Sequence, residues 1–390
     1  MGAGLAGVGA VRALRELGYP GRVVLVGDEP HVPYDRPPLS KEYLAGAMPV
    51  EALRLVAPDE DLDVDRRTGT AVALDPATRR VRLDTGEEVG GDGVVLAAGA
   101  RARTLPGSTP AGVHTLRSLD DARGLRGDLR PGARLVIVGG GFLGAEVAST
   151  ARGLGVEVTV VETEAVPLAR ALGPRVGAAC AALHVEHGVR LCTGVAVDRL
   201  LGDGDGRVRA VTLADGRVLD ADVVLVAVGS VPAVGWLAGS GLDVTGGVLT
   251  DAAGATGVPG IVAAGDCTRR IEAGAGVVVR QEHWTNALHQ PYRAAASLLG
   301  ADAPGQPVQA TVPYLWSDQY GRRLQFAGHR RPGDEEQMVD GDLAAHRFAV
   351  VYRRGGTLVA VLAVDTPRVF TRLRRDLAAV TAPPEGRPEG

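Results

Sequence analysis

Lysine is almost absent from this chain of 390 residues: among its 42 lysines and arginines, Lys41 is the single lysine. Either one lysine has survived by chance, or position 41 requires a compact ammonium on a flexible stem, which a guanidinium does not replace. We favour the second interpretation because Lys41 directly follows a proline-rich loop, residues 30–40.

Cysteines are also scarce, and their positions argue against two kinds of site. Cys180, Cys192 and Cys267 have spacings that fit neither a C-x-x-C redox pair nor a zinc site, so we expect three small core residues. His184 and His187 lie three residues apart on an expected helix, and we expect no acid or thiol there to act as a further metal ligand. We therefore predict no metal site.

Long apolar runs are missing too. No stretch approaches the roughly 20 residues needed to span a bilayer, and the N-terminus has no basic region or cleavable signal, so a cytoplasmic location without membrane contact is expected. The net charge of −4 forces no strongly basic face, which argues against nucleic acid as a partner. With 45% apolar and 23% charged residues, the composition is that of a soluble globular protein of two or three domains.

Glycine, in contrast, is abundant and occurs twice in the same pattern. The chain opens with Gly2-Ala3-Gly4-Leu5-Ala6-Gly7, and Gly139-Gly140-Gly141-Phe142-Leu143-Gly144 follows an apolar run 137 residues later. Each segment matches G-x-G-x-x-G, in which the glycines allow a tight strand-to-helix turn and a close approach to a pyrophosphate. One such motif is a weak signal in a chain with 55 glycines, because ordinary turns produce it by chance.

An acidic residue completes each pattern. Asp28 follows the apolar run 23–26, and Glu162 follows the apolar run 158–161. Acids at these positions accept hydrogen bonds from ribose hydroxyls. Two dinucleotide sites in one chain indicate an electron-transfer enzyme in which a nicotinamide meets a flavin.

The remaining segments extend this organisation. Strands are expected near 71–74, 80–83, 93–97, 223–227 and 261–264, the last running into Gly265-Asp266. Beyond residue 307, strand-like segments 323–327, 347–352 and 358–364 and a basic helix 367–380 indicate an antiparallel sheet with one helix. Only Met1 precedes the first glycine, so we expect Met1 to be the last residue of a strand whose earlier residues are not in this sequence.

Four further segments give the chain a specific resemblance. They are Pro33-Tyr34-Asp35-Arg36-Pro37-Pro38-Leu39-Ser40-Lys41, Ala264-Gly265-Asp266-Cys267, Glu282-His283-Trp284-Thr285-Asn286-Ala287 and Trp316-Ser317-Asp318-Gln319-Tyr320. Together with the glycine motifs, they make nearly the whole chain similar to the oxygenase-coupled FAD-dependent NADH–ferredoxin reductases. This is the group of putidaredoxin reductase and rubredoxin reductase.

The resemblance implies an α/β fold with two Rossmann-like dinucleotide-binding domains, as in glutathione reductase, and a C-terminal α+β interface domain. FAD is expected at the first glycine motif and NAD(H) at the second. The implied boundaries are 1–104 with 233–306 for a discontinuous FAD-binding domain, 105–232 for the NAD-binding domain and 307–390 for the interface domain.

The resemblance also assigns residues by position. The implied flavin-pocket residues are Ala6, Asp28, Lys41, Val72, Arg117, Asp266 and Trp284, and the implied contacts to the adenosine half of NAD(H) are Glu162 and Arg170. Other expected cofactor contacts are Gly2, Gly4, Leu5, Gly7, Arg36, Ala98, Gly99, Gly139, Gly141, Phe142, Leu143, Gly144, Gly229, Glu282 and His283. Ala98 departs from the family, which usually has threonine there.

Several of these residues have a second interpretation. In this second interpretation, Asp266, at the end of a strand, caps the next turn, and Trp284 is an ordinary core aromatic. Arg36 would pair with Asp35 on the surface, and Arg117 would lie on a solvated helix face.

The implied reaction is hydride transfer from NADH to flavin N5, with electrons leaving singly to an iron–sulfur ferredoxin that supplies a monooxygenase or dioxygenase. Related disulfide reductases and peroxide- or oxygen-reducing enzymes use cysteine near the flavin, whereas the loop 37–40 has none. This favours an external one-electron acceptor. An NADH oxidase, or a reductase of a small molecule, is the alternative. A signalling flavoprotein similar to apoptosis-inducing factor would want a basic surface that this chain does not offer.

Three more specific expectations follow. Glu162 would repel a 2′-phosphate, so NADH should be preferred over NADPH, with Arg170 softening the preference. Arginines of the C-terminal region should steer an acidic ferredoxin: Arg322, Arg323, Arg330, Arg331, Arg368, Arg372, Arg374 and Arg375. The resemblance to related flavoproteins also implies that Lys41 and Glu146 form a catalytic ion pair where flavin and nicotinamide meet.

Overall fold

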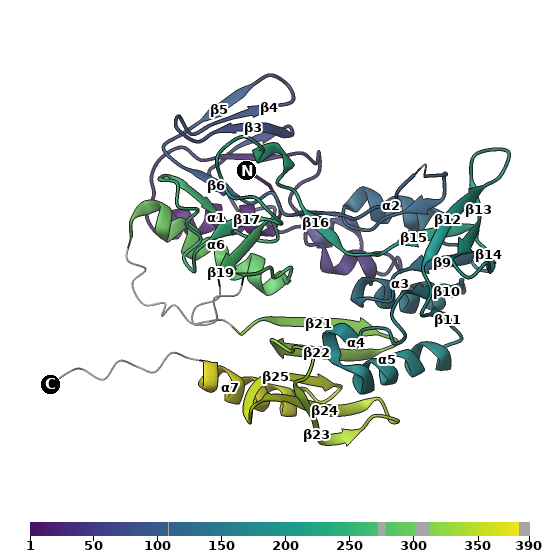
Figure 1. Ribbon diagram of the computed structural model, residues 1–390. Helices are drawn as coiled ribbons and strands as arrows, with labels where there is room; N and C mark the ends of the chain where they lie inside the picture. The colour runs from purple at the N-terminus through teal and green to yellow at the C-terminus, as the bar shows by residue number, and fades with distance from the viewer. Residues whose placement is uncertain (108, 272–277, 302–311, 382–390) are drawn as a thin grey trace. The chain divides into compact units, whose positions relative to one another are not determined.

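The computed structural model describes residues 1–107, 109–271, 278–301 and 312–381 (Figure 1). The chain forms two compact units, and each is assembled from separate segments. The first unit contains Met1–Pro37, Pro49–Arg101 and Ser230–Gln306, and the second contains Pro38–Met48, Ala102–Gly229 and Pro307–Gly390. The domain boundary expected at 306/307 lies outside the described residues.

The parallel strands of the first unit are organised around the chain start. β1 (Val24–Gly27) pairs with β2 (Asp65–Thr68), and β6 (Val94–Leu96) pairs with β18 (Ile261–Ala263). Met1 is hydrogen-bonded to β6 and the residue after it: its amino group donates to Val95 O (2.7 Å), and its carbonyl accepts from the N–H of Ala97 (2.7 Å). Gly2 bonds toward β1, donating to Val26 O (2.8 Å). The amino and carbonyl groups of Met1 thus both bond to the segment 95–97, and the first glycine motif begins directly after Met1.

Two helices pack against the parallel strands of the first unit. α1 (Leu5–Glu16) begins within the first glycine motif, and α6 (Trp284–Leu299) packs against it so closely that a Cβ on Gly9 would lie 3.2 Å from Pro291. Ala6 of α1 and Ala294 of α6 share one core with residues on or directly after β6 and β18: Ala97, Val262 and Ala264. Small residues are needed here because the backbones approach closely.

Smaller sheets complete the first unit. β3 (Ala71–Asp75), β4 (Arg80–Leu83) and β5 (Glu88–Gly90) form an antiparallel sheet. β17 (Val248–Thr250), β19 (Thr268–Ile271) and β20 (Val278–Val279) form a mixed sheet, in which β17 is parallel and β20 antiparallel to β19. β7 (Ala100–Ala102) pairs with β16 (Ser230–Pro232).

The second unit contains a parallel sheet of the Rossmann type. Its order is β11 (Arg190–Thr193), β10 (Glu157–Glu162), β9 (Arg134–Val138), β15 (Val223–Val226) and β8 (Val113–His114), and every neighbouring pair is parallel. The central strands are apolar on both faces, as buried parallel strands require. An antiparallel sheet adjoins it: β12 (Val197–Gly202), β13 (Val208–Leu213) and β14 (Val218–Asp220).

The helices of this part of the chain begin where turn chemistry predicts them. α3 (Phe142–Gly153) begins within the second glycine motif. α2 (Leu119–Asp128) begins after Ser118, which forms a capping box with Asp121. α4 (Ala169–Leu172) and α5 (Pro174–Glu186) follow β10.

The C-terminal strand-like segments form the expected antiparallel sheet. Its order is β21 (Tyr314–Gln319), β22 (Arg322–Gly328), β25 (Thr357–Val364), β24 (Arg347–Arg354) and β23 (Glu335–Asp342). One face packs against α7 (Pro367–Thr381), and the other packs against α4 and α5 (Figure 1). The sheet therefore shares a core with α4 and α5 of its own unit.

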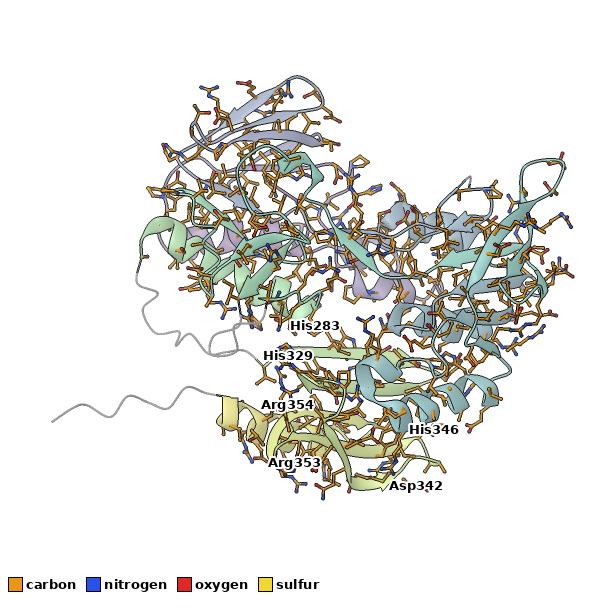
Figure 2. All side chains as sticks on the ribbon, in the orientation of Figure 1. His283, His329, Asp342, His346, Arg353 and Arg354 are labelled. Carbon is orange, nitrogen blue, oxygen red and sulfur yellow. The ribbon has the colours of Figure 1, made fainter. Side chains whose placement is uncertain are left out.

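Polar contacts also join α5 to this sheet. His184 Nδ1 lies 2.6 Å from the Tyr320 hydroxyl, and His346, on the turn between β23 and β24 (Figure 2), lies 3.0 Å from Glu186 Oε2. The His187 ring stacks on the Tyr320 ring, with centroids 4.3 Å apart. These histidines thus fasten a helix to a sheet.

We expect the stability of the protein to fall in mild acid because of His184. Its side chain is 2% exposed, and burial lowers its pKa to about 4 from an ordinary value of 6.5. The unfolded chain takes up a proton below pH 6.5, whereas the folded ring stays neutral, so stability is complete above pH 6.5 and declines toward pH 4. The full loss is about 3 kcal/mol.

Urea unfolding of the wild type and of His184→Gln between pH 7.5 and 4.5 tests this expectation. The glutamine does not titrate, so the loss of unfolding free energy across this range should be smaller in the variant by about 2–3 kcal/mol. Identical pH profiles for the two proteins would show that His184 contributes nothing to acid sensitivity.

Candidate functional site

The first glycine motif folds as a tight turn in which two positions admit only glycine. Gly2 has φ +107°, and a Cβ there would lie 2.0 Å from Ala97 O. A Cβ on Gly7 would lie 1.8 Å from Gly2 O. At Gly4, by contrast, a Cβ would meet nothing within 4 Å. The turn is therefore packed on its inner side and open at its second glycine.

The second motif repeats this geometry in the other unit. Gly139 has φ +108°, and its Cβ would lie 2.4 Å from Ala227 O, while a Cβ on Gly144 would lie 2.2 Å from Gly139 O. Gly141 is open in the same way as Gly4. The chain thus builds one turn twice.

Both turns fit a dinucleotide pyrophosphate. Gly4 is the N-cap residue of α1, and Gly141 is the N-cap residue of α3. Neither glycine has a side chain that could cap its helix. The first N–H groups of each helix consequently face a space that no side chain fills at that glycine, which suits an anion. Ala98-Gly99 and Val228-Gly229 follow the adjacent strands β6 and β15, and both glycines have positive φ.

The two predicted ribose acids differ in their surroundings. Asp28 follows β1 and is half exposed, with one oxygen 3.7 Å from Arg101 Nη2. Glu162 ends β10 and accepts the N–H of Gly140 (2.7 Å) and of Glu164 (2.9 Å). Glu162 thus ties its strand to the glycine turn, a role that sequence reasoning did not foresee. Its contact with ribose stays a prediction.

Around the first turn, segments that are distant in sequence lie close together. A Cβ on Gly265 would lie 2.8 Å from the Ala6 side chain, so Asp266 follows a residue in direct contact with the first motif. At the start of α6, Trp284 Nε1–H donates to Asp35 Oδ1 (2.7 Å), which fixes the loop before Lys41. Trp284 is half-buried, and its place at a flavin stays a prediction.

Charged residues of the first unit also have protein partners. Arg36 Nη2 lies 2.6 Å from Glu29 Oε1, and its guanidinium lies over the Tyr34 ring. Glu282 accepts from Ser230 and pairs with Arg280.

The other predicted contacts lie at the ends or edges of elements. Val72 is 41% exposed on β3, and His283 is the N-cap residue of α6. Arg117 precedes α2, and its backbone N–H donates to Asp121. Arg170 is exposed on α4. Two residues follow Gly141 at the start of α3: Phe142 packs toward the C-terminal sheet, and Leu143 is half-buried.

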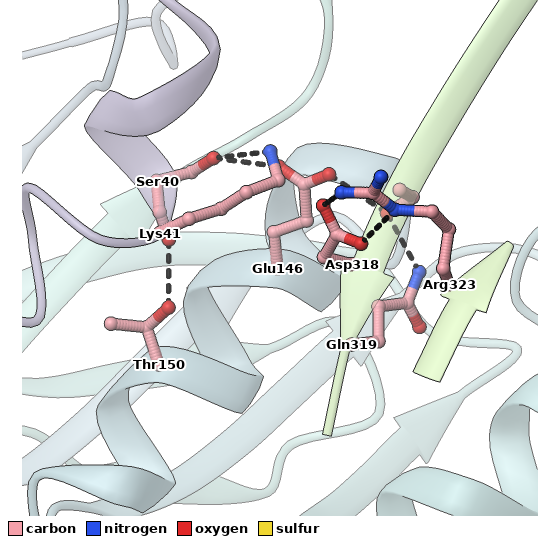
Figure 3. Close-up of polar contacts among 8 residues, drawn as sticks. Ser40, Lys41, Glu146, Thr150, Asp318, Gln319 and Arg323 are labelled. Atoms are coloured by element: carbon pink, nitrogen blue, oxygen red, sulfur yellow. Dashed lines mark hydrogen bonds and ion pairs between the residues drawn. The ribbon is translucent and has the colours of Figure 1, made fainter. Parts of the chain in front are cut away.

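Lys41 and Glu146 form the predicted ion pair (Figure 3). Lys41 Nζ lies 2.6 Å from Glu146 Oε2, and the side chains are only 12% and 8% exposed. Glu146 lies on the second turn of α3, two residues after Gly144, and Lys41 follows the 3₁₀ turn Pro37–Ser40. Both residues belong to the second unit. The catalytic role of the pair stays a prediction.

Three polar residues that sequence reasoning had not assigned complete this cluster. Ser40 Oγ donates to Glu146 Oε2 (2.6 Å), and Ser317 Oγ, from β21, donates to Glu146 Oε1 (2.8 Å). Thr150, one turn further along α3, donates to Ser40 O (2.8 Å). The carboxylate therefore receives two hydroxyl donors besides the ammonium, which compensates for its burial. Ser317 lies in the Trp316–Tyr320 motif, and this motif was the feature of the sequence that could have identified it as a site residue.

The cysteines are buried free thiols. Burial raises the pKa of Cys267 to about 11 and that of Cys180 to about 12, so neither provides a thiolate at neutral pH. Cys192 is buried as well, 2% exposed. The sequence contains no other cysteine, and these three are core residues, as expected.

Comparisons with known proteins agree with this geometry. Residues 1–290 match the pyridine nucleotide-disulphide oxidoreductase family, and residues 314–387 match the reductase C-terminal family. The chain is 40% identical, over 98% of its length and 94% of the relative's, to the biphenyl dioxygenase system ferredoxin–NAD(+) reductase component of Paraburkholderia xenovorans. It is 38% identical to rhodocoxin reductase of Rhodococcus erythropolis, over 97% and 88% of the two chains.

Solved structures give the same result. The reductase of the covalent putidaredoxin reductase–putidaredoxin complex superposes with a TM-score of 0.92 at 35% identity, over 97% of this chain and 92% of that one. The ferredoxin reductase for the CYP199A2 system of Rhodopseudomonas palustris gives 0.89 at 34% identity, over 96% and 93%.

The chain belongs to the pyridine nucleotide-disulphide oxidoreductase family, within its ferredoxin reductases. It is an oxidoreductase whose cofactors are FAD and NAD(H). The helices in the described ranges include none that is long and apolar enough to cross a membrane.

Proposed function

We propose that the protein passes electrons from NADH, through FAD, to an iron–sulfur ferredoxin that supplies a monooxygenase or dioxygenase. When bound, FAD accepts a hydride and releases its electrons one at a time. The observation that carries the proposal is the combination of two open glycine turns with three cysteines that are all buried. Without an accessible thiol, the chain offers no sulfur relay, which favours an external one-electron acceptor.

The residues of each turn have separate tasks in this proposal. The first turn, with Asp28 and Asp266, would hold FAD, and the second turn, with Glu162 and Arg170, would hold NADH. Glu162 is fixed by the N–H groups of Gly140 and Glu164, so its carboxylate has a defined position from which to repel a 2′-phosphate. Buried free cysteines are typical of a reducing compartment, which supports a cytoplasmic location.

The structure separates the C-terminal arginines into two groups. Arg322 pairs with Asp365 (2.9 Å), Arg323 pairs with Asp318 (2.7 Å), and Arg330 binds backbone carbonyls. Arg374 lies over the Tyr314 ring. Four other arginines of this region have exposed side chains that would steer an acidic ferredoxin: Arg331, Arg368, Arg372 and Arg375.

Steady-state turnover of the FAD-loaded enzyme tests the proposal, with NADH or NADPH as donor and with a [2Fe–2S] ferredoxin or oxygen as acceptor. We expect ferredoxin to be reduced much faster than oxygen, and kcat/KM to favour NADH by roughly 5- to 150-fold, which corresponds to about 1–3 kcal/mol. The ferredoxin rate should fall as salt rises to physiological strength, where charges are screened beyond about 8 Å.

Each arm of this experiment has its own contrary result. Oxygen turnover unaffected by ferredoxin would indicate an NADH oxidase. Equal kcat/KM for the two donors would remove the role given to Glu162, and a rate insensitive to salt would remove the steering role of the arginines.

A further inference from the structure

The C-terminal sheet holds the short helix α4 through a shared apolar core. Leu168 and Leu172 belong to one cluster with Phe326, Phe348 and Tyr352 of the sheet. Leu172 and Tyr352 are fully buried. α4 has only four residues, so it depends on this packing for its position.

Polar bonds from the sheet fix the same helix at its backbone. Arg330 Nη1 donates to Ala169 O (3.3 Å) and to Arg170 O (3.1 Å), and the Tyr352 hydroxyl donates to Leu172 O (2.5 Å). The carbonyl of Ala169 also accepts the N–H of Gly173 (2.8 Å), so Arg330 adds a second bond there. The carbonyls in the last turn of a helix carry partial negative charge, which suits a guanidinium.

Arg330 is itself held in place. The turn after β22 is closed by a bidentate pair in which Arg354 binds both oxygens of Asp334 (2.8 Å each). The Asp334 side chain is only 2% exposed, and Arg354 also donates to His329 O (3.3 Å). His329 and Arg354 are labelled in Figure 2. The arginine that reaches α4 thus projects from a rigid base.

α4 in turn lies against the second glycine turn. Pro167, which precedes it, packs so closely that its Cβ lies 3.3 Å from the position of a Cβ on Gly140. Phe142, which follows Gly141, packs against the same core cluster as Leu168. A shift of α4 therefore moves the wall of this turn together with Arg170, which is exposed on α4.

We propose that Arg330 is a positioning residue for the nicotinamide dinucleotide. By binding the carbonyls of Ala169 and Arg170, it fixes α4 where the adenosine half of NAD(H) binds, although it lies on the turn after β22 of the C-terminal sheet. The inference rests on binding of NAD(H) at the second glycine turn. It gives this sheet a part in NADH binding that is separate from any docking of a ferredoxin.

Affinity of the FAD-loaded enzyme for NAD⁺ and for ADP-ribose tests this inference. ADP-ribose lacks the nicotinamide, so it reports the adenosine half alone. For Arg330→Met we expect both dissociation constants to rise about 5- to 20-fold. KM for NADH should rise with kcat changed less than about twofold, because the removed contact would act on binding and not on the transition state alone.

Arg331→Met is the matched control, since it removes the same charge from the adjacent, exposed position and should leave both affinities unchanged. Tyr352→Phe removes only the hydroxyl bond to Leu172, and it should raise the dissociation constant for ADP-ribose about 2- to 5-fold. This variant tests the inference even if Arg330→Met does not fold. Unchanged ADP-ribose affinity in Arg330→Met, or an equal loss in Arg331→Met, overturns the inference. Failure of the wild type to bind NAD⁺ would instead overturn the proposed function.

Discussion

Lys41→Met is expected to slow the reduction of bound FAD by NADH at least about tenfold. In the proposed reaction, the ammonium stabilises the negative charge that develops on the flavin as it accepts a hydride, and an electrostatic contact of this kind is worth several kcal/mol in a water-poor site. Lys41 is 12% exposed and bonded to Glu146, so its charge is held in one place. Anaerobic stopped-flow mixing with NADH, followed at the flavin absorbance band, measures the rate.

The same substitution should destabilise the protein. Without Lys41, the carboxylate of Glu146 remains buried with only the hydroxyls of Ser40 and Ser317 as donors. Removing one partner of a buried ion pair typically costs about 3–5 kcal/mol, and the two hydroxyls should keep the loss near the lower value. Urea unfolding of the wild type and Lys41→Met measures it.

Two further variants test what position 41 requires and whether the effect is specific to the ion pair. Lys41→Arg keeps the charge but replaces a compact ammonium by a planar fork, so the flavin reduction rate should still fall if position 41 requires lysine. Ser317→Ala leaves the ion pair intact and should change the rate much less than Lys41→Met does. A wild-type rate in Lys41→Met would exclude a catalytic role for the pair.

Gly144→Ala is expected to abolish most NAD(H) binding while leaving FAD in place. The added Cβ would lie 2.2 Å from the carbonyl oxygen of Gly139, and a backbone atom has no rotamer by which to give way. The second turn must therefore open, at about 1–3 kcal/mol of strain, and NAD⁺ affinity should fall roughly 10- to 100-fold. Titration with NAD⁺ and the ratio of flavin to protein absorbance measure the two effects.

The control lies on the same helix. A Cβ on Gly153, the last residue of α3, would meet nothing within 4 Å, so Gly153→Ala should bind NAD⁺ as the wild type does. The counterpart in the first turn is Gly7→Ala, whose Cβ would lie 1.8 Å from Gly2 O and which should lose FAD instead. Wild-type NAD⁺ affinity in Gly144→Ala would mean that the second turn is not the nucleotide site.

Local patterns in the sequence were sufficient for the turns and most of the elements. The glycine spacing predicted both strand-to-helix turns, because positive φ at Gly2 and Gly139 and the tight packing at Gly7 and Gly144 admit no side chain. The strand-like segments beyond residue 307 predicted the antiparallel C-terminal sheet, because short runs rich in apolar and β-branched residues are typical of strands. The pairing of Lys41 with Glu146 came from resemblance to relatives and not from a local pattern.

Only the tertiary structure decided which side chains meet across long stretches of chain. Ser317 reaches Glu146 from a residue 171 positions away, and Arg330 reaches the carbonyl of Ala169 from 161 positions away. Glu162, expected to face ribose, also binds the N–H of Gly140. Local rules fix backbone conformation because they depend on neighbouring residues. The partner of a buried charge depends instead on which elements pack together, and that is settled by the whole core.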